Sequence, residues 1–227
     1  MLKNIINKLP YFRYYYSKNI FENLNLIFVH IPRTSGTSIS FVLNKLNKIN
    51  NNQSELKKIN RFYISKRTKH YKHDKVIDYL NFLNKKNINP NKINFVTIIR
   101  NLWDWYNSSY YWYKKYKHNS KIENFQKIKN LKFDDFIEYS LKNKIIGNAK
   151  GMQFDYFTNK QNIKLKIFKL EEKNFSRFLK KNYNNEINIS IFNKYADLSY
   201  KKNYSSKSKD MVYKYYKNFI KKFKYFF

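Results

Sequence analysis

Short apolar runs alternate along the chain with longer segments in which apolar residues recur every three or four positions. The run at residues 26–31 is rich in β-branched and aromatic residues, and it predicts a strand that is buried on both faces. The run at residues 93–99 predicts a second strand of this kind. Further strands are expected at residues 61–65 and 163–170.

Helices are predicted between and after these strands. Their apolar stripes lie at residues 39–46, 76–83, 102–116, 133–141, 171–181 and 206–222. Because strands alternate with helices, we expect an α/β fold of three layers, α/β/α, with a central parallel sheet. The sequence has no internal repeat and no clear linker. We therefore expect one domain over residues 25–227, preceded by an N-terminal arm at residues 1–24.

The charge is strongly one-sided, with 47 Lys and Arg against 15 Asp and Glu and a net charge of +32 in 227 residues. Such a surplus attracts phosphates, sulfates, nucleic acids or anionic membranes. However, the enriched residues Lys, Asn, Ile, Tyr and Phe have codons built from A and T, so a low-GC viral or microbial genome would produce the same bias. The surplus is also spread along the whole chain, and charge alone does not identify the function.

Composition excludes several classes of protein. Cysteine is absent and there are only four histidines, which excludes a disulfide scaffold and a thiol nucleophile and leaves little room for a zinc centre. A content of 42% hydrophobic residues argues against a disordered chain. Because no window holds 18 uninterrupted apolar residues and the first residues lack the pattern of a secretory signal, we expect a cytoplasmic protein with no transmembrane segment.

The segment at residues 32–38 has the layout of a loop that binds phosphate. It joins an apolar strand to a helix, so backbone N–H groups and the positive end of the helix dipole would meet there. Arg33 adds a permanent positive charge, and hydroxyl donors come from Thr34, Ser35, Thr37 and Ser38. The loop lacks the first glycine and the lysine of nucleoside triphosphatases. A polar connection capped by Ser or Thr is the structural alternative.

Two segments resemble the signatures of sulfotransferases that use 3′-phosphoadenosine 5′-phosphosulfate (PAPS). Residues 27–38, IFVHIPRTSGTS, are similar to the loop F-V-H-I-P-K-T-x-G-T-S of the carbohydrate branch of that family. Residues 95–104, FVTIIRNLWD, with Ser108 and Tyr110 beyond them, resemble the second signature F-x-x-V-R-N-P-W-D-R-x-x-S-x-Y. Weaker similarities follow in the family's order at residues 69–80, 133–137, 153–157, 168–171 and 212–227, so the resemblance spans about residues 25–227.

The resemblance implies a fold related to P-loop nucleotide-binding proteins and an enzyme that moves a sulfuryl group from PAPS to a hydroxyl acceptor, most plausibly a glycan. No metal is implied. The residues that would bind the 5′-phosphosulfate are Arg33, Thr34, Ser35, Gly36, Thr37 and Ser38, and Arg33 would also stabilise the departing phosphate. Arg100 and Ser108 would hold the 3′-phosphate. A structural bridge from Arg100 to Asp104 is the alternative.

A base must accept the proton of the attacking hydroxyl, and neutral imidazole suits this role near neutral pH. We assign it to His70, with His73 as a close rival one helical turn away. Where other branches of the family use a carboxylate, the nearby candidates are Glu55, Asp74 and Asp78. His30 is expected to pack between strand and loop.

The sequence departs from the family's pattern at three positions. Arg33 stands where lysine is usual, Leu102 replaces a proline and Trp105 replaces a basic residue. Of the three, only Arg33 is expected to take part in the chemistry directly. Its side chain keeps the positive charge of lysine but does not donate a proton to the leaving group. The alternatives are a P-loop-type small-molecule kinase and a non-catalytic protein that binds polyanions on the same scaffold. No specific nucleic-acid partner is expected.

Overall fold

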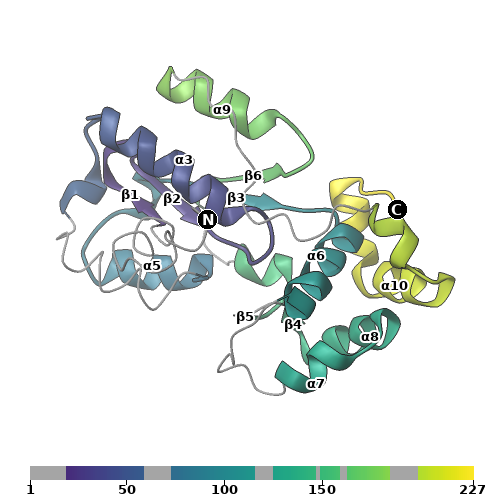
Figure 1. The fold of residues 1–227 in the computed structure, drawn as a ribbon. Helices are drawn as coiled ribbons and strands as arrows, with labels where there is room; N and C mark the ends of the chain where they lie inside the picture. Colours follow the sequence, from purple (N-terminus) through teal and green to yellow (C-terminus); the bar gives the residue numbers. More distant parts are fainter. Residues whose placement is uncertain (1–18, 59–72, 116–124, 147–148, 159–162, 185–198) are drawn as a thin grey trace. The chain divides into compact units, whose positions relative to one another are not determined.

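The computed structural model describes residues 19–58, 73–115, 125–146, 149–158, 163–184 and 199–227 (Figure 1). These residues form two compact units. The sheet unit comprises the described parts of Met1–Ile31, Ser35–Ile99 and Asp155–Phe192, and the helical unit those of Pro32–Thr34, Arg100–Phe154 and Asn193–Phe227. Residues 1–18 of the predicted N-terminal arm and the predicted strand at 61–65 lie outside the described residues.

The sheet unit is built on four strands in the order β1-β2-β3-β6. Strand β2 (Leu26–Val29) pairs in parallel with β3 (Asn94–Ile99), which pairs in parallel with β6 (Leu165–Lys169). The edge strand β1 (Ile20–Phe21) is antiparallel to β2. The predicted α/β class is thus confirmed at the level of a small, mostly parallel sheet flanked by helices. Strand β1 lies within residues 1–24, the segment predicted as an arm, and it is part of this sheet.

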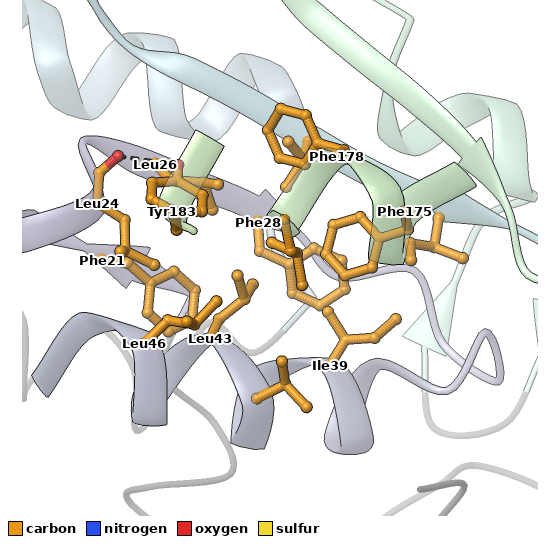
Figure 2. Close-up of a cluster of buried hydrophobic side chains, with 14 residues drawn as sticks. Phe21, Leu24, Leu26, Phe28, Ile39, Leu43, Leu46, Phe175, Phe178 and Tyr183 are labelled. Atoms are coloured by element: carbon orange, nitrogen blue, oxygen red, sulfur yellow. Dashed lines mark hydrogen bonds between the residues drawn. The ribbon is translucent and has the colours of Figure 1, made fainter. Parts of the chain in front are cut away.

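One face of the sheet is covered by α3 (Gly36–Ile49) and α9 (Asn174–Tyr183). Figure 2 shows Ile39, Leu43 and Leu46 of α3 within a cluster that also contains Phe175 and Phe178 of α9. In β2 and β3 the residues that alternate with those of the cluster are also buried, so both faces of these two strands are removed from solvent. This double burial explains why β2 and β3 are mostly apolar rather than alternating.

The remaining elements of the sheet unit are short connections and one more helix. Helix α5 (Val76–Asn84) contributes buried residues of its own, none of which joins the cluster of Figure 2. The single turns η1 (Glu22–Leu24), η2 (Glu55–Lys58) and η3 (Pro90–Lys92) fill the connections. The Asn89 side chain caps η3 by accepting a hydrogen bond from the N–H of Asn91, as expected for a turn at this Asn- and Pro-containing segment.

The helical unit consists mainly of helices. It contains α6 (Leu102–Lys115), α7 (Phe125–Asn130), α8 (Phe133–Asn143), α10 (Ser206–Phe223), the strands β4 (Ile145–Ile146) and β5 (Ala149–Lys150), and η5 (Tyr200–Asn203). The turn η4 (Gln153–Tyr156) begins in this unit. Tyr106 of α6 and Tyr216 of α10 are buried, and their hydroxyl oxygens lie 3.0 Å apart. Burial holds the pKa of Tyr106 well above its usual value.

Most predicted elements agree with the structure to within three residues. Helix α9 begins at Asn174, three residues after the predicted start at residue 171. A turn precedes it, in which the N–H of Glu172 donates to the carbonyl of Lys169 at 3.2 Å. Within the part of the chain that is described, no helix has both the length and the apolar character needed to cross a membrane.

Candidate functional site

The loop between β2 and α3 has unusual backbone conformations. Arg33 has φ of 65° and Ser35 has φ of 60°, so both lie in the left-handed region although neither is glycine. Each such residue stores about 1 to 3 kcal/mol of strain and persists only where surrounding contacts enforce it. Ser35 precedes α3 and makes no side-chain capping bond to it. The simple capped connection considered from the sequence is therefore not formed by Ser35.

Gly36 packs directly against the ring of His30 in the sheet unit. A Cβ atom at position 36 would lie 1.9 Å from Nε2 of His30, far inside van der Waals contact. His30 is itself buried, and its ring stacks on Phe28 at 5.5 Å and meets His73 edge-on at 4.6 Å. A glycine is required here because the first turn of α3 approaches the end of β2 so closely.

Three predicted phosphate ligands form one hydrogen-bonded cluster in the helical unit. Nη1 of Arg100 donates to the backbone carbonyl of Arg33 at 3.1 Å, which joins residues 67 positions apart in the chain. Nη2 of Arg33 donates to Oγ of Ser108 at 3.1 Å. Ser108 lies in α6, two turns after Arg100 leaves β3. The two predicted signatures therefore meet at these three residues.

Ser108 and Arg100, which the resemblance implies as ligands of one phosphate, have different bonding partners within this cluster. Ser108 accepts a hydrogen bond from Nη2 of Arg33. Arg100 instead forms an ion pair with Asp104, with Nε and Oδ2 2.7 Å apart. This is the bridge that was raised as the structural alternative. It uses one nitrogen of the guanidinium, and a second, Nη1, contacts the Arg33 carbonyl.

Two further residues fix the backbone around the cluster. The indole N–H of the buried Trp105 donates to the carbonyl of Pro32 at 2.7 Å. The carboxamide of Gln153 bonds both the N–H and the carbonyl of Arg100, each at 2.9 Å. Sequence reasoning assigned no role to either side chain. A weak signal existed for Gln153, since it opens one of the segments that resemble the family.

The other predicted loop residues differ in exposure. Thr34 and Ser38 are fully buried, while Ser35 and Thr37 are partly accessible. The hydroxyl groups that the sequence grouped together are therefore not equally available to a ligand.

The candidate bases are only partly described. His70 lies outside the described residues. His73 is described in the sheet unit, with Nδ1 3.0 Å from the carbonyl oxygen of His30. Because a carbonyl can only accept, Nδ1 carries the hydrogen, and the basic lone pair of neutral His73 is then on Nε2. A neutral His73 would therefore accept a proton at Nε2.

The carboxylates considered as alternative bases have other structural roles or are buried. Asp78 accepts a hydrogen bond from the N–H of Lys75 at the start of α5, and Glu55 lies 3.7 Å from the ammonium of Lys92. Asp74 is buried. Within the described ranges, no three His, Asp or Glu residues are grouped so that they could hold a metal ion.

Comparisons with known proteins give no assignment for this arrangement. No protein-family model, no curated protein and no solved structure matches the chain.

Proposed function

We propose that this protein transfers a sulfuryl group from PAPS to a hydroxyl acceptor, most plausibly a carbohydrate, on a three-layer fold related to P-loop nucleotide-binding proteins. The observation that carries the proposal is the cluster of Arg33, Arg100 and Ser108. Arg33 belongs to one of the two sequence signatures, and Arg100 and Ser108 belong to the other. Random pairs of residues so far apart in the chain rarely share hydrogen bonds.

The cluster suits a ligand with more than one anionic group. Two guanidinium groups, on Arg33 and Arg100, are linked through the Arg33 carbonyl, and each presents a planar fork of N–H donors that matches phosphate oxygens. We assign the 3′-phosphate of PAPS to Arg100 and Ser108, and the 5′-phosphosulfate to Arg33 and the loop up to Ser38. The left-handed residues Arg33 and Ser35 support this assignment, because backbone of this kind turns N–H groups toward an anion.

In the proposed reaction the oxygen of the acceptor hydroxyl attacks the sulfur atom of PAPS. A new S–O bond to the acceptor forms as the bond between sulfur and the bridging phosphate oxygen breaks. The electron pair of that bond stays on the 5′-phosphate, so the product nucleotide is adenosine 3′,5′-bisphosphate. Arg33 would stabilise this developing charge by its own charge and hydrogen bonds. The acceptor's proton passes to His70 or to Nε2 of His73.

The direct test is ligand binding by the purified protein. Adenosine 3′,5′-bisphosphate should raise the melting temperature without added magnesium, because a ligand that binds the folded state stabilises it by mass action. Arg100→Ala should weaken this binding by about 10- to 100-fold, the usual effect of losing one hydrogen-bonded charge contact. Arg177→Ala is the matched control, since Arg177 is an exposed arginine of α9 in the sheet unit. Transfer of radiolabel from PAPS to a panel of glycans then tests the reaction.

The same experiment separates the alternatives. A small-molecule kinase would respond to ATP with magnesium and not to the bisphosphate. A non-catalytic polyanion binder, which the net charge of +32 favours, would bind oligonucleotides or sulfated glycans with a steep salt dependence and show no preference for the bisphosphate over adenosine 5′-phosphate. Either result would rule out the sulfotransferase proposal.

A further inference from the structure

We infer that Gln153 is a positioning residue that sets Arg100 to select a nucleotide bearing a 3′-phosphate. This inference rests on the proposed function, because it concerns the same site. Gln153 does not touch the ligand in this account. It acts through the backbone of Arg100, and its contribution is to hold the guanidinium where the phosphate binds.

The contact between Gln153 and Arg100 is a matched pair of hydrogen bonds. The N–H of Arg100 donates to Oε1 of Gln153, and Nε2 of Gln153 donates to the carbonyl of Arg100, both at 2.9 Å. A carboxamide has one acceptor side and one donor side, and a backbone residue has one of each. Gln153 thus pairs with Arg100 as a neighbouring strand would pair with it, one residue after β3 ends at Ile99.

Burial makes this pairing demanding. Gln153 is fully buried, so water cannot replace its amide if the side chain is altered. An uncompensated N–H or carbonyl at this point would destabilise the observed backbone position of Arg100. Fully buried glutamines are uncommon, because burying an amide is costly unless its hydrogen bonds are satisfied.

The side chain of Arg100 is fixed at the same time from two other directions. Asp104 accepts from Nε at 2.7 Å, and the carbonyl of Arg33 accepts from Nη1 at 3.1 Å. The two bonds to Gln153 fix the backbone from which the Arg100 side chain extends, and the contacts to Asp104 and Arg33 fix the orientation of its guanidinium. A phosphate then binds without first ordering a long, flexible side chain, which is the main cost of using arginine as a ligand.

Loss of the Gln153 amide should weaken binding of the 3′-phosphate specifically rather than binding of the whole nucleotide. If Arg100 is displaced, affinity for the 3′-phosphate falls, while contacts to the rest of the nucleotide remain. The measured quantity is therefore the ratio of affinities for adenosine 3′,5′-bisphosphate and adenosine 5′-phosphate, determined by titration calorimetry. A role in stability alone would lower both affinities together or neither of them.

The test variant is Gln153→Glu, which keeps the size of the side chain and replaces its donor by a second acceptor facing the Arg100 carbonyl. We expect the affinity ratio to fall by about tenfold or more, since displacement of a binding group by about 1 Å costs up to about 100-fold. The control is Gln126→Glu in α7, an exposed residue of the helical unit with the same change in charge. It should leave the ratio unchanged.

Should Gln153→Glu not fold, Gln153→Asn serves as the second variant. It keeps the amide and shortens its reach by one methylene, so the ratio should fall in the same direction. An unchanged ratio in a folded Gln153 variant overturns the inference and leaves the proposed function standing. A wild-type protein that does not prefer the bisphosphate overturns the proposed function itself, and the role of Gln153 with it.

Discussion

Replacing Gly36 by alanine should destabilise the sheet unit through a single contact. The added Cβ would lie 1.9 Å from Nε2 and 2.0 Å from Cδ2 of His30. Ordinary contact begins near 3.4 Å, so the ring or the helix must move by about 1.5 Å. The ring has little room to do so, because His30 is buried between Phe28 and His73.

The expected magnitude follows from two opposing effects. Overpacking a buried site of this kind costs about 1 to 3 kcal/mol of the free energy of unfolding. Alanine also favours the helical conformation over glycine by up to about 1 kcal/mol, since it loses less backbone entropy on folding. Gly36→Ala should therefore lower the free energy of unfolding by about 1 to 2 kcal/mol. In a His30→Ala background the clash is gone, and the same substitution should be neutral or stabilising.

The assay is urea denaturation of the four proteins of this double-mutant cycle, followed by circular dichroism. The coupling between positions 30 and 36 should be about 1 to 3 kcal/mol, because the clash exists only when both side chains are present. Ser40→Ala, also in α3 and buried, is a control that removes atoms rather than adding them. If Gly36→Ala destabilises equally with and without the His30 ring, the close approach of α3 to β2 is not the reason for glycine at this position.

Two further substitutions test other parts of the structure. Tyr183 donates its hydroxyl to the carbonyl of Leu24, and burial raises its pKa to about 12. The unfolded tyrosine ionises near pH 10, so folding becomes less favourable as the pH rises from 10 to 12. Over this range the free energy of unfolding of the wild type, relative to that of Tyr183→Phe, should fall by up to about 3 kcal/mol in urea titrations. A constant difference between the two proteins would contradict the buried position of Tyr183. Ser205 caps α10 by accepting from the N–H of Ser208 and donates to Asp134. Ser205→Ala should lower the free energy of unfolding by about 1 kcal/mol in thermal unfolding, because the cap of α10 is lost. It should also raise the pKa of Asp134 measured by NMR, because burial acts to raise that pKa while hydrogen bonds from Ser205 and Ser208 hold it below its usual value. An unchanged pKa would exclude the contact between Ser205 and Asp134.

The sequence predicted those elements that are long or buried on both sides. Strands β2 and β3 carry a strong apolar signal because both of their faces are covered, and α6 carries a stripe over four turns. By contrast, β1 has two residues and exists through its pairing with β2, and α7 has six residues with two of them buried. Such elements depend on distant contacts that no local pattern records.

For the candidate site, residue types could be predicted and their partners could not. Arg33, Arg100 and Ser108 were identified from their signatures, and the structure brings them together. Which donor meets which acceptor depends on the course of the backbone after β3, and the side chain of Gln153, 53 positions away, helps to set that course. Apart from its place at the start of a segment that resembles the family, Gln153 has neither charge nor periodicity that would indicate its bonds to the backbone.

The arginine at position 33, where the resembling family has lysine, fits its surroundings for a physical reason. In this structure the side chain already donates one N–H, from Nη2, to Ser108. A lysine ammonium has three donors on one nitrogen, whereas a guanidinium has five donors on three nitrogens in a plane, so it can bond a hydroxyl through one nitrogen and a phosphate through another. On the proposed function, Arg33 can therefore keep its link to Ser108 while it stabilises the leaving phosphate. The replacement of lysine by arginine then keeps the positive charge and changes only the number and geometry of its hydrogen-bond donors.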